Sequence, residues 1–155
     1  MSEIGFFPPA AFYFDVEIPG GGSLDGSFQE VSGIEVESDV EEINEGGQND
    51  FVHRVPGRNK YKNLVLKRGL LYKGSGLTKW CKKRFDESLN LSGRVGVKDI
   101  TVHLNNEKGD PIFTWTFHRA YPVKWSIGGF NSQENAVSVE TIEFAFSHFS
   151  TSPKG

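Results

Sequence analysis

The four histidines are the side chains in this sequence best suited to bind a metal ion or to move protons near neutral pH. They are His53, His103, His118 and His148, and they are spread widely along the chain. None has another His, a Cys or a carboxylate at the spacing typical of a metal-binding motif. We therefore interpret them as ordinary strand or loop residues, and the sequence predicts neither a metal site nor a bound cofactor.

Two glycine-rich segments and one cysteine are the remaining candidates for chemistry. Lys73-Gly74-Ser75-Gly76 opens a predicted helix, but no Gly-Lys-Ser/Thr follows it, so it is not a phosphate-binding P-loop. Gly20–Gly22 lacks the strand–helix context of a nucleotide-binding loop. Cys81, the single cysteine, falls on the apolar side of the same helix, a poor position for a nucleophile. No catalytic constellation remains, and the sequence does not predict an enzyme.

Charge is distributed unevenly along a chain whose net charge is only −3. Residues 1–52 carry 12 acidic side chains and no Lys or Arg, whereas residues 53–94 carry 12 basic side chains and two acidic ones. Acidic and basic strands lying side by side within one subunit would explain this pattern, and so would two regions that contact different neighbours in an assembly. A third explanation, nucleic-acid binding by the basic block from Arg54 to Arg94, is weaker, because a dedicated nucleic-acid binder is usually basic overall.

Hydrophobic periodicity predicts a mainly β protein. Phe12, Phe14, Val16 and Ile18 alternate with polar residues and indicate a half-buried strand at 11–18. Residues 105–110 have the composition of a hairpin turn. Further strands are predicted at 27–40, with a bulge or kink at Ser32-Gly33, and at 62–72, 96–104, 111–120, 121–127 and 137–149.

One segment has the periodicity of a helix. Apolar residues at spacings of three and four predict an amphipathic helix at about 77–89, with Ser75 or Thr78 as its N-cap. Many antiparallel strands with one helix indicate a small β-barrel or sandwich of two packed antiparallel sheets with one flanking helix. A length of 155 residues suits a single domain covering residues 1–155.

Residues 41–61 break the strand pattern. The segment contains Gly46-Gly47, Pro56-Gly57 and few apolar side chains, and the sign of the charge changes within it. Loops of about 20 residues without secondary structure are uncommon in compact domains and are usually functional or disordered. We therefore predict a long irregular loop that becomes ordered against a neighbouring molecule.

Four short runs resemble the tail-tube family of contractile phages. They are Phe28-Gln29-Glu30-Val31-Ser32-Gly33-Ile34, Glu45-Gly46-Gly47, Val55-Pro56-Gly57 and Tyr61-Lys62-Asn63-Leu64-Val65-Leu66-Lys67-Arg68-Gly69-Leu70. The Leu-Lys-Arg-Gly-Leu segment that follows Pro-Gly is the most specific of them. The same family includes inner-tube proteins of extracellular contractile injection systems, and its fold is similar to that of the hemolysin-coregulated protein of type VI secretion.

The resemblance implies a structural protein that assembles with copies of itself into stacked hexameric rings. Strands of adjacent subunits would join around a channel for DNA or effector cargo, and the tube would contact a sheath protein, a baseplate or spike and a tube terminator. The protein is then expected to be made in the cytoplasm and to end in a virion tail or an injection particle, with release by lysis. The start of the sequence is unlike a signal peptide, and no apolar run approaches the roughly 20 residues of a membrane span, so membrane insertion is not expected.

The resemblance, the irregular segment and the charge pattern together give candidate contact residues. Contacts between subunits and between rings are predicted at Glu41, Glu42, Glu45, Gly46, Gly47, His53, Arg54, Pro56, Gly57, Arg58, Tyr61, Lys67, Arg68 and Gly69. The hydroxyl-rich and acidic strand faces suggest Thr114, Thr116 and Glu140 as side chains that line the channel. Reversing the charge of Lys67 and Arg68 is accordingly expected to weaken assembly while leaving the subunit folded.

Overall fold

A computed structural model describes residues 12–19, 25–44, 52–69, 75–86, 96–128 and 138–153. Strands account for most of these residues, and one helix accompanies them. In chain order the elements are β1 (Tyr13–Glu17), β2 (Asp25–Phe28), β3 (Glu30–Ser32), β4 (Val36–Ile43), β5 (His53–Tyr61), β6 (Leu64–Gly69), α1 (Gly76–Asp86), β7 (Lys98–Asn105), β8 (Pro111–Gly128), β9 (Val139–Ala145) and β10 (His148–Pro153). The protein is mainly β, as the sequence predicted.

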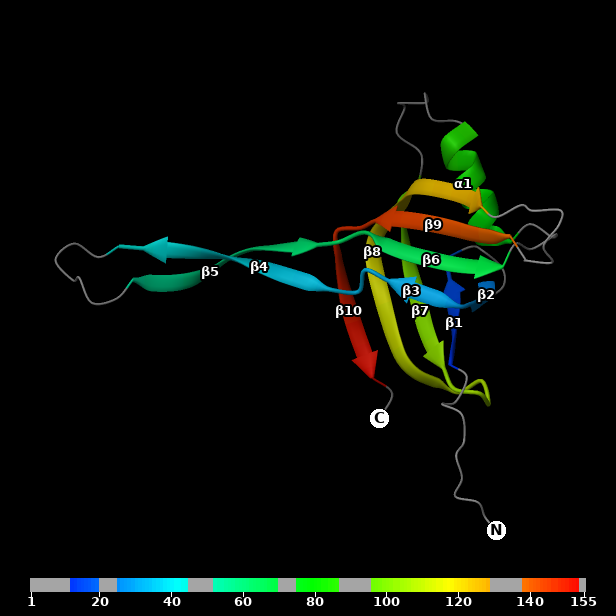
Figure 1. The fold of residues 1–155 in the computed structure, drawn as a ribbon, viewed down its shortest axis with the longest axis horizontal. Helices are drawn as coiled ribbons and strands as arrows, with labels where there is room; N and C mark the ends of the chain where they lie inside the picture. The colour runs from blue at the N-terminus through cyan, green and yellow to red at the C-terminus, as the bar shows by residue number, and fades with distance from the viewer. Residues whose placement is uncertain are drawn as a thin grey trace, which may run out of the picture.

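The strands form one curled antiparallel sheet and a separate two-stranded ribbon (Figure 1). The order in the curled sheet is β2-β1-β7-β8-β9-β6-β3, and β10 pairs with β8 outside this path. β8 belongs to both halves of the sheet: its first half pairs with β7 and β10, and residues 121–128 pair with β9. The sheet therefore curls into a half-barrel, which confirms the predicted mainly β fold with a flanking helix.

β8 bends at Arg119, where it passes from one half of the sheet to the other. The backbone of Arg119 has a φ of 56°, a left-handed conformation that costs a non-glycine residue about 1–2 kcal/mol. Its amide donates a hydrogen bond to the carboxylate of Asp99 at 3.1 Å. The sequence predicted two strands, at 111–120 and 121–127, because a bend at a single residue leaves little trace in hydrophobic periodicity.

Apolar side chains from both halves of the sheet and from the helix form one core. Phe28, Phe117 and Phe144 are fully buried in it. Helix α1 buries Trp80 and Cys81, and the Trp80 ring stacks on Phe144 with ring centroids 5.6 Å apart. Cys81 is therefore a small core residue, as predicted. The predicted end of the helix, at 87–89, lies outside the described residues.

Strands β4 and β5 pair with each other and extend away from the half-barrel as a ribbon (Figure 1). The prediction of an irregular loop at 41–61 was therefore wrong for residues 41–43 and 53–61. All side chains of β4 are exposed, so this segment has no buried face to impose the apolar–polar alternation by which half-buried strands are identified. The predicted strand at 27–40 is in fact divided among β2, β3 and β4.

Gly33 lies where the chain leaves β3 and turns into the ribbon. Its backbone has a φ of +90°, and a Cβ at this position would overlap the backbone carbonyl oxygen of Asn63. The amide of Glu35 donates to the Gly33 carbonyl at 2.9 Å and closes the turn. The predicted kink at Ser32-Gly33 is confirmed, and only glycine satisfies both the conformation and the space.

Replacing Gly33 by Ala should destabilise the subunit, because the new methyl group meets backbone and the residue must keep a left-handed φ. We expect Gly33→Ala to lower the free energy of unfolding by about 2–4 kcal/mol in urea titrations followed by tryptophan fluorescence. Gly128→Ala is the matched control, since a Cβ at that position meets nothing within 4 Å, and its effect should stay within about 0.5 kcal/mol. Equal losses in the two variants would contradict this explanation.

Candidate functional site

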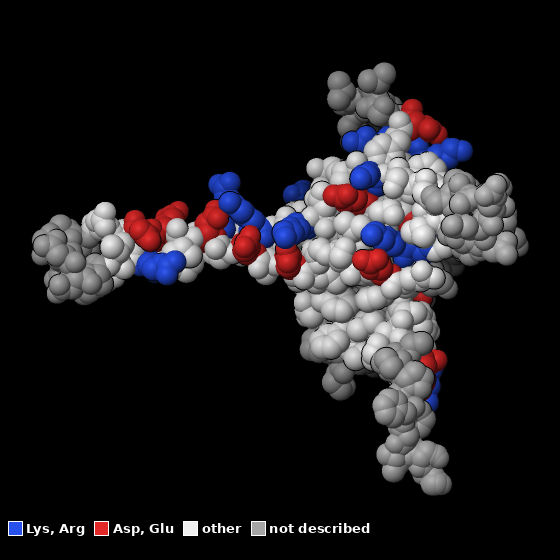
Figure 2. Space-filling model, viewed as in Figure 1, with Lys and Arg blue, Asp and Glu red and all other residues white. Residues whose placement is uncertain are grey.

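The ribbon carries an acidic strand beside a basic strand, and the two charges alternate along its surface in Figure 2. In the register of the strands, Glu37 lies opposite Lys60 and Glu42 lies opposite Arg54. The Lys60 ammonium also lies 3.1 Å from a carboxylate oxygen of Asp39. Each exposed pair contributes only about 0–1 kcal/mol. Together, however, they compensate the charge of the ribbon within the subunit.

The same pairing of acidic and basic residues continues at the base of the ribbon. Lys62 lies 2.7 Å from the carboxylate of Glu35, and the hydrogen bond and charge of Glu35 raise the pKa of the Lys62 ammonium. On the half-barrel, Lys67 of β6 lies 3.8 Å from Glu30 of the neighbouring strand β3. Of the three explanations for the charge pattern, the described residues support the first, in which acidic and basic segments are neighbours within one subunit.

One face of the ribbon carries two exposed valines of β4. Val36 and Val40 are 50% and 51% exposed, and they share a face because they are four positions apart on one strand. Their partners across the ribbon are Tyr61 and Pro56. An isolated two-stranded hairpin is at best marginally stable in water. The Tyr61 ring packs against Phe146 and Phe149 of the same subunit, whereas Val36 and Val40 remain half exposed; these two valines and their surroundings are called the apolar face of the ribbon.

A second surface is the outward face of the sheet half formed by β1, β7, β8 and β10. Thr114 and Thr116 alternate along β8 with Phe117, which is buried in the core, so the two threonines point to the opposite face. The Thr114 hydroxyl lies 3.0 Å from Nδ1 of a histidine on β7. The residues beside the threonines on this face are also polar: Asp15, Glu17, Thr101, His103, Ser150 and Ser152.

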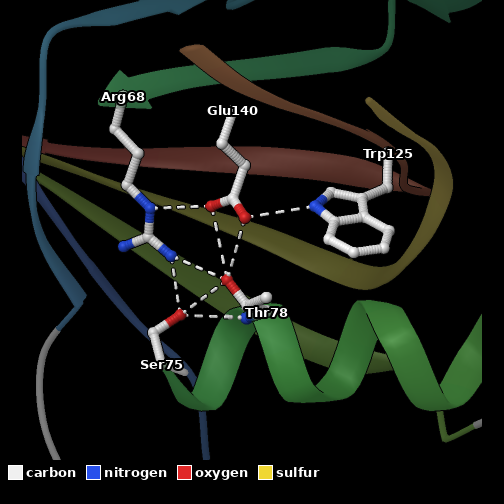
Figure 3. A network of polar contacts seen from close by, with 5 residues as sticks. All are labelled: Arg68, Ser75, Thr78, Trp125 and Glu140. Atoms are coloured by element: carbon white, nitrogen blue, oxygen red, sulfur yellow. Dashed lines mark hydrogen bonds and ion pairs between the residues drawn. The ribbon is translucent and has the colours of Figure 1, made fainter. Parts of the chain in front are cut away.

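Arg68 of β6 and Glu140 of β9 form a buried ion pair on the side of the sheet that faces helix α1 (Figure 3). The guanidinium Nε donates to Glu140 Oε1 at 2.9 Å, and the two side chains are 1% and 3% exposed. Arg68 also donates to the hydroxyls of Ser75 at 2.6 Å and Thr78 at 2.9 Å. The indole N–H of Trp125 donates to the other carboxylate oxygen of Glu140 at 3.1 Å. The pair thus connects β6, β8 and β9 with the start of α1.

Ser75 caps helix α1 and belongs to this network at the same time. Its hydroxyl oxygen accepts the backbone N–H of Thr78 at 3.0 Å, the geometry of an N-cap. This confirms Ser75, rather than Thr78, as the cap. Because the same oxygen receives the guanidinium of Arg68, the start of the helix is fixed relative to the sheet.

Two predicted assembly residues are therefore enclosed by their own subunit. Glu140 does not line a channel and Arg68 does not face a neighbouring subunit, so both assignments were wrong. Every second residue of β6 is buried, and Arg68 is the third of these after Leu64 and Leu66. Every second residue of β9 is buried in the same way, and Glu140 is the first of these, before Ile142 and Phe144. This period of two was the signal in the sequence, and the charge of the residues obscured it.

Comparison with known protein families identifies the family of this chain. The family model described as the T4-like virus tail tube protein gp19 matches residues 10–150. The chain belongs to this tail tube family. Its members are structural proteins rather than enzymes. No curated protein sequence matches the chain.

Solved structures share the fold of this tail tube protein. A chain of an extracellular contractile injection system, from the PVC sheath/tube terminator in its extended state, is 25% identical, with 95% of this chain and 98% of that chain covered and a TM-score of 0.73. A chain of the anti-feeding prophage baseplate is 24% identical, with coverages of 99% and 98% and a TM-score of 0.69. Hcp1 from Flavobacterium johnsoniae is 14% identical, with coverages of 92% and 96% and a TM-score of 0.52.

Most of the predicted contact residues of the tail tube protein lie together on the ribbon. These are Glu41, Glu42, His53, Arg54, Pro56, Gly57, Arg58 and Tyr61. Lys67 and Gly69 lie on β6, whereas Glu45, Gly46 and Gly47 lie outside the described residues. Sequence reasoning did not identify Val36 and Val40 as surface residues. The alternation of apolar residues with carboxylates is visible in the sequence, but the exposure of the whole strand is not.

The part of the chain described above contains neither a group of possible metal ligands nor a helix that could span a membrane. Within those residues, no three or more His, Cys, Asp or Glu side chains are arranged so that they could hold a metal ion. The one described helix is too short and too polar to span a membrane.

Removing one partner of the buried ion pair should unfold the subunit more readily. We expect Arg68→Met and Glu140→Gln each to lower the free energy of unfolding by about 3–5 kcal/mol, because each leaves a buried polar or charged group without its partner. Lys67→Met is the control: Lys67 lies on the same strand and its 3.8 Å contact with Glu30 is exposed, so a change of at most about 1 kcal/mol is expected. Urea unfolding measures all three, and a mild effect at Arg68 would contradict the role assigned to the pair.

Proposed function

We propose that this tail tube protein assembles into hexameric rings that stack into the rigid inner tube of a contractile tail or injection particle. The ribbon is the observation that carries the proposal. At about 3.3 Å per residue, the eight residues of β4 extend about 25 Å. A ribbon of this length, with half-exposed valines on one face, gains its missing contacts when it packs against another subunit.

Unpaired strand edges support ring formation. Among the described strands, β10 pairs only with β8, and β2 stands at one end of the strand order. An edge strand exposes a row of backbone N–H and C=O groups that can pair with another chain. A closed ring of subunits removes such edges, as closure of a β-barrel does. Rings joined in this way share an obligate interface, for which about 2,000 Å² or more of buried surface is usual.

The hydroxyl-rich face of β7, β8 and β10 suits the wall of a channel. Thr114 and Thr116 lie on it with polar neighbours on the adjacent strands, and the core lies on the other side of the sheet. A wall of short hydroxyl side chains is wetted by water and offers a sliding polymer no apolar surface to adhere to. We propose that DNA or protein cargo passes along this face.

The remaining partners and the location follow from the same proposal. Solved relatives come from a baseplate, a sheath–tube complex, a tube terminating cap and a sheath/tube terminator. We infer that this protein likewise meets a sheath, a baseplate or spike and a terminator. On this proposal it is made in the cytoplasm and becomes part of a virion tail or an injection particle that lysis releases.

Acidic substitutions on the apolar face of the ribbon should block assembly without unfolding the subunit. In the variant Val36→Asp/Val40→Asp, sedimentation velocity and electron microscopy should show at least about a tenfold higher concentration needed for rings, the size of effect expected at the centre of an interface. The melting temperature should change little, because both side chains lie on the ribbon outside the core.

The control for this experiment is Glu37→Gln, one residue from Val36 and on the opposite face of the same strand. It should assemble like the unmodified protein. Unmodified protein that stays monomeric at high concentration, or rings that persist in the double aspartate variant, would refute the proposed role of the ribbon.

Nucleic-acid binding by the basic block is the competing function, and the ion pairs of the ribbon argue against it. Lys60, Lys62 and Lys67 each have an acidic partner within the subunit. We expect fluorescence anisotropy with labelled DNA to detect no affinity tighter than the roughly 10⁻⁴ M of weak non-specific binding at physiological salt. Submicromolar binding that weakens steeply with salt would favour the competing function instead.

A further inference from the structure

Two histidines stack on each other where β10 begins, and the proposed function gives them no role. His118 of β8 and His148 of β10 are register partners in the paired strands. Their ring centroids are 4.4 Å apart and their planes are inclined by 20°. The His118 side chain is 30% exposed and His148 is exposed, so protons reach both rings.

Few groups face the histidine pair. From β7, a carboxylate oxygen of Asp99 lies 3.6 Å from Nδ1 of His118. From β10, the Ser150 hydroxyl lies 3.3 Å from Nε2 of His118, and just before β10 the Ser147 hydroxyl lies 2.9 Å from Nδ1 of His148. Among the described residues that contact the rings, Asp99 supplies the negative charge.

The same residues also hold the bend of β8. The second oxygen of the Asp99 carboxylate accepts the backbone N–H of Arg119 at 3.1 Å. The backbone N–H and hydroxyl of Ser147 donate to the carbonyl oxygen of His118 at 2.9 and 3.1 Å. The start of β10 is therefore attached to the bend through the backbone of His118, the residue whose ring stacks on His148.

We propose that the stacked His118 and His148 form an acid-sensitive clasp that holds β10 on β8 when the rings are neutral and loosens it when both are protonated. Histidine ordinarily changes its charge between pH 5 and 8. Two neutral rings pack face to face, but two positive rings at this separation repel, and one carboxylate balances only one of the charges. Among the described strands β10 pairs with β8 alone, so the loosening affects this pairing first, while the Phe149 ring of β10 also packs against Tyr61 and Phe117.

The clasp is a property of the subunit and goes beyond the proposed function. Its consequence for assembly does rest on that function: if the outer edge of β10 pairs with a neighbouring subunit, acid weakens the ring at this joint. Light scattering at each pH records the assembled fraction, so failure of assembly is distinguished from failure of the clasp.

Hydrogen exchange of the full chain tests the clasp directly. After correction for intrinsic exchange rates, the amides of β10 should open about tenfold more often near pH 5.5 than near pH 8, while those of β6 and β9 change little. A tenfold change corresponds to about 1.4 kcal/mol, which lies between the repulsion of two unit charges about 4 Å apart in bulk water and that near a protein surface. Because the repulsion is electrostatic, salt near 1 M should reduce the difference.

Three variants separate the clasp from a general response to acid. His148→Gln removes one charge and should abolish most of the pH effect, whereas Asp99→Asn removes the compensating charge and should enlarge it. His103→Gln is the control, since His103 lies on β7, bonded to Thr114 and near Glu17, and it should behave like the unmodified protein. Circular dichroism near pH 8 checks that each variant is folded.

Two results would overturn the proposal. One is β10 protection in the unmodified protein that is unchanged between the two pH values. The other is a loss of the pH effect in His103→Gln as large as that in His148→Gln. If His148→Gln is poorly folded, the salt dependence of exchange in the unmodified protein decides, and a pH effect insensitive to salt counts against the clasp.

Discussion

The ion pair between Arg68 and Glu140 determines how the parts of this tail tube subunit fit together. A charge buried to this degree is tolerated only with a partner and with further hydrogen bonds on its remaining donors and acceptors. Ser75, Thr78 and Trp125 supply them from the start of α1 and from β8. Each must therefore occupy a fixed position, which sets the helix against the curled sheet and holds β6 and β9 in register.

The subunit has two parts: a half-barrel with its own buried core, which contains this network, and an exposed ribbon without one. The half-barrel and its helix enclose a continuous core, with side chains such as Phe117 and Phe144 fully buried. The ribbon has no core, and its stability as an isolated hairpin is marginal. In the proposed tube, neighbouring copies would complete the ribbon and pair with the strand edge that is unpaired among the described residues, while the body resists deformation.

Charge in this protein is arranged for local compensation rather than for attraction between subunits. The acidic strand β4 lies beside the basic strand β5, and contacts such as Lys60 with Asp39 join them. On the proposed function, assembly would then depend more on apolar contact and strand pairing than on long-range attraction, and would vary little with salt concentration.

The amino-acid sequence by itself determined the mainly β fold, the single helix with its buried Cys81, the kink at Gly33 and the likeness to tail tube proteins. Each of these follows from a local sequence pattern: the alternation of apolar and polar residues, apolar residues at helical spacing, a residue type that a backbone conformation requires, or a short family motif. Tertiary structure alone decided that residues 41–43 and 53–61 form a ribbon and that Arg68 and Glu140 are buried together. An exposed ribbon leaves no periodic signal, and a buried ion pair depends on partners 72 residues apart, which local patterns do not connect.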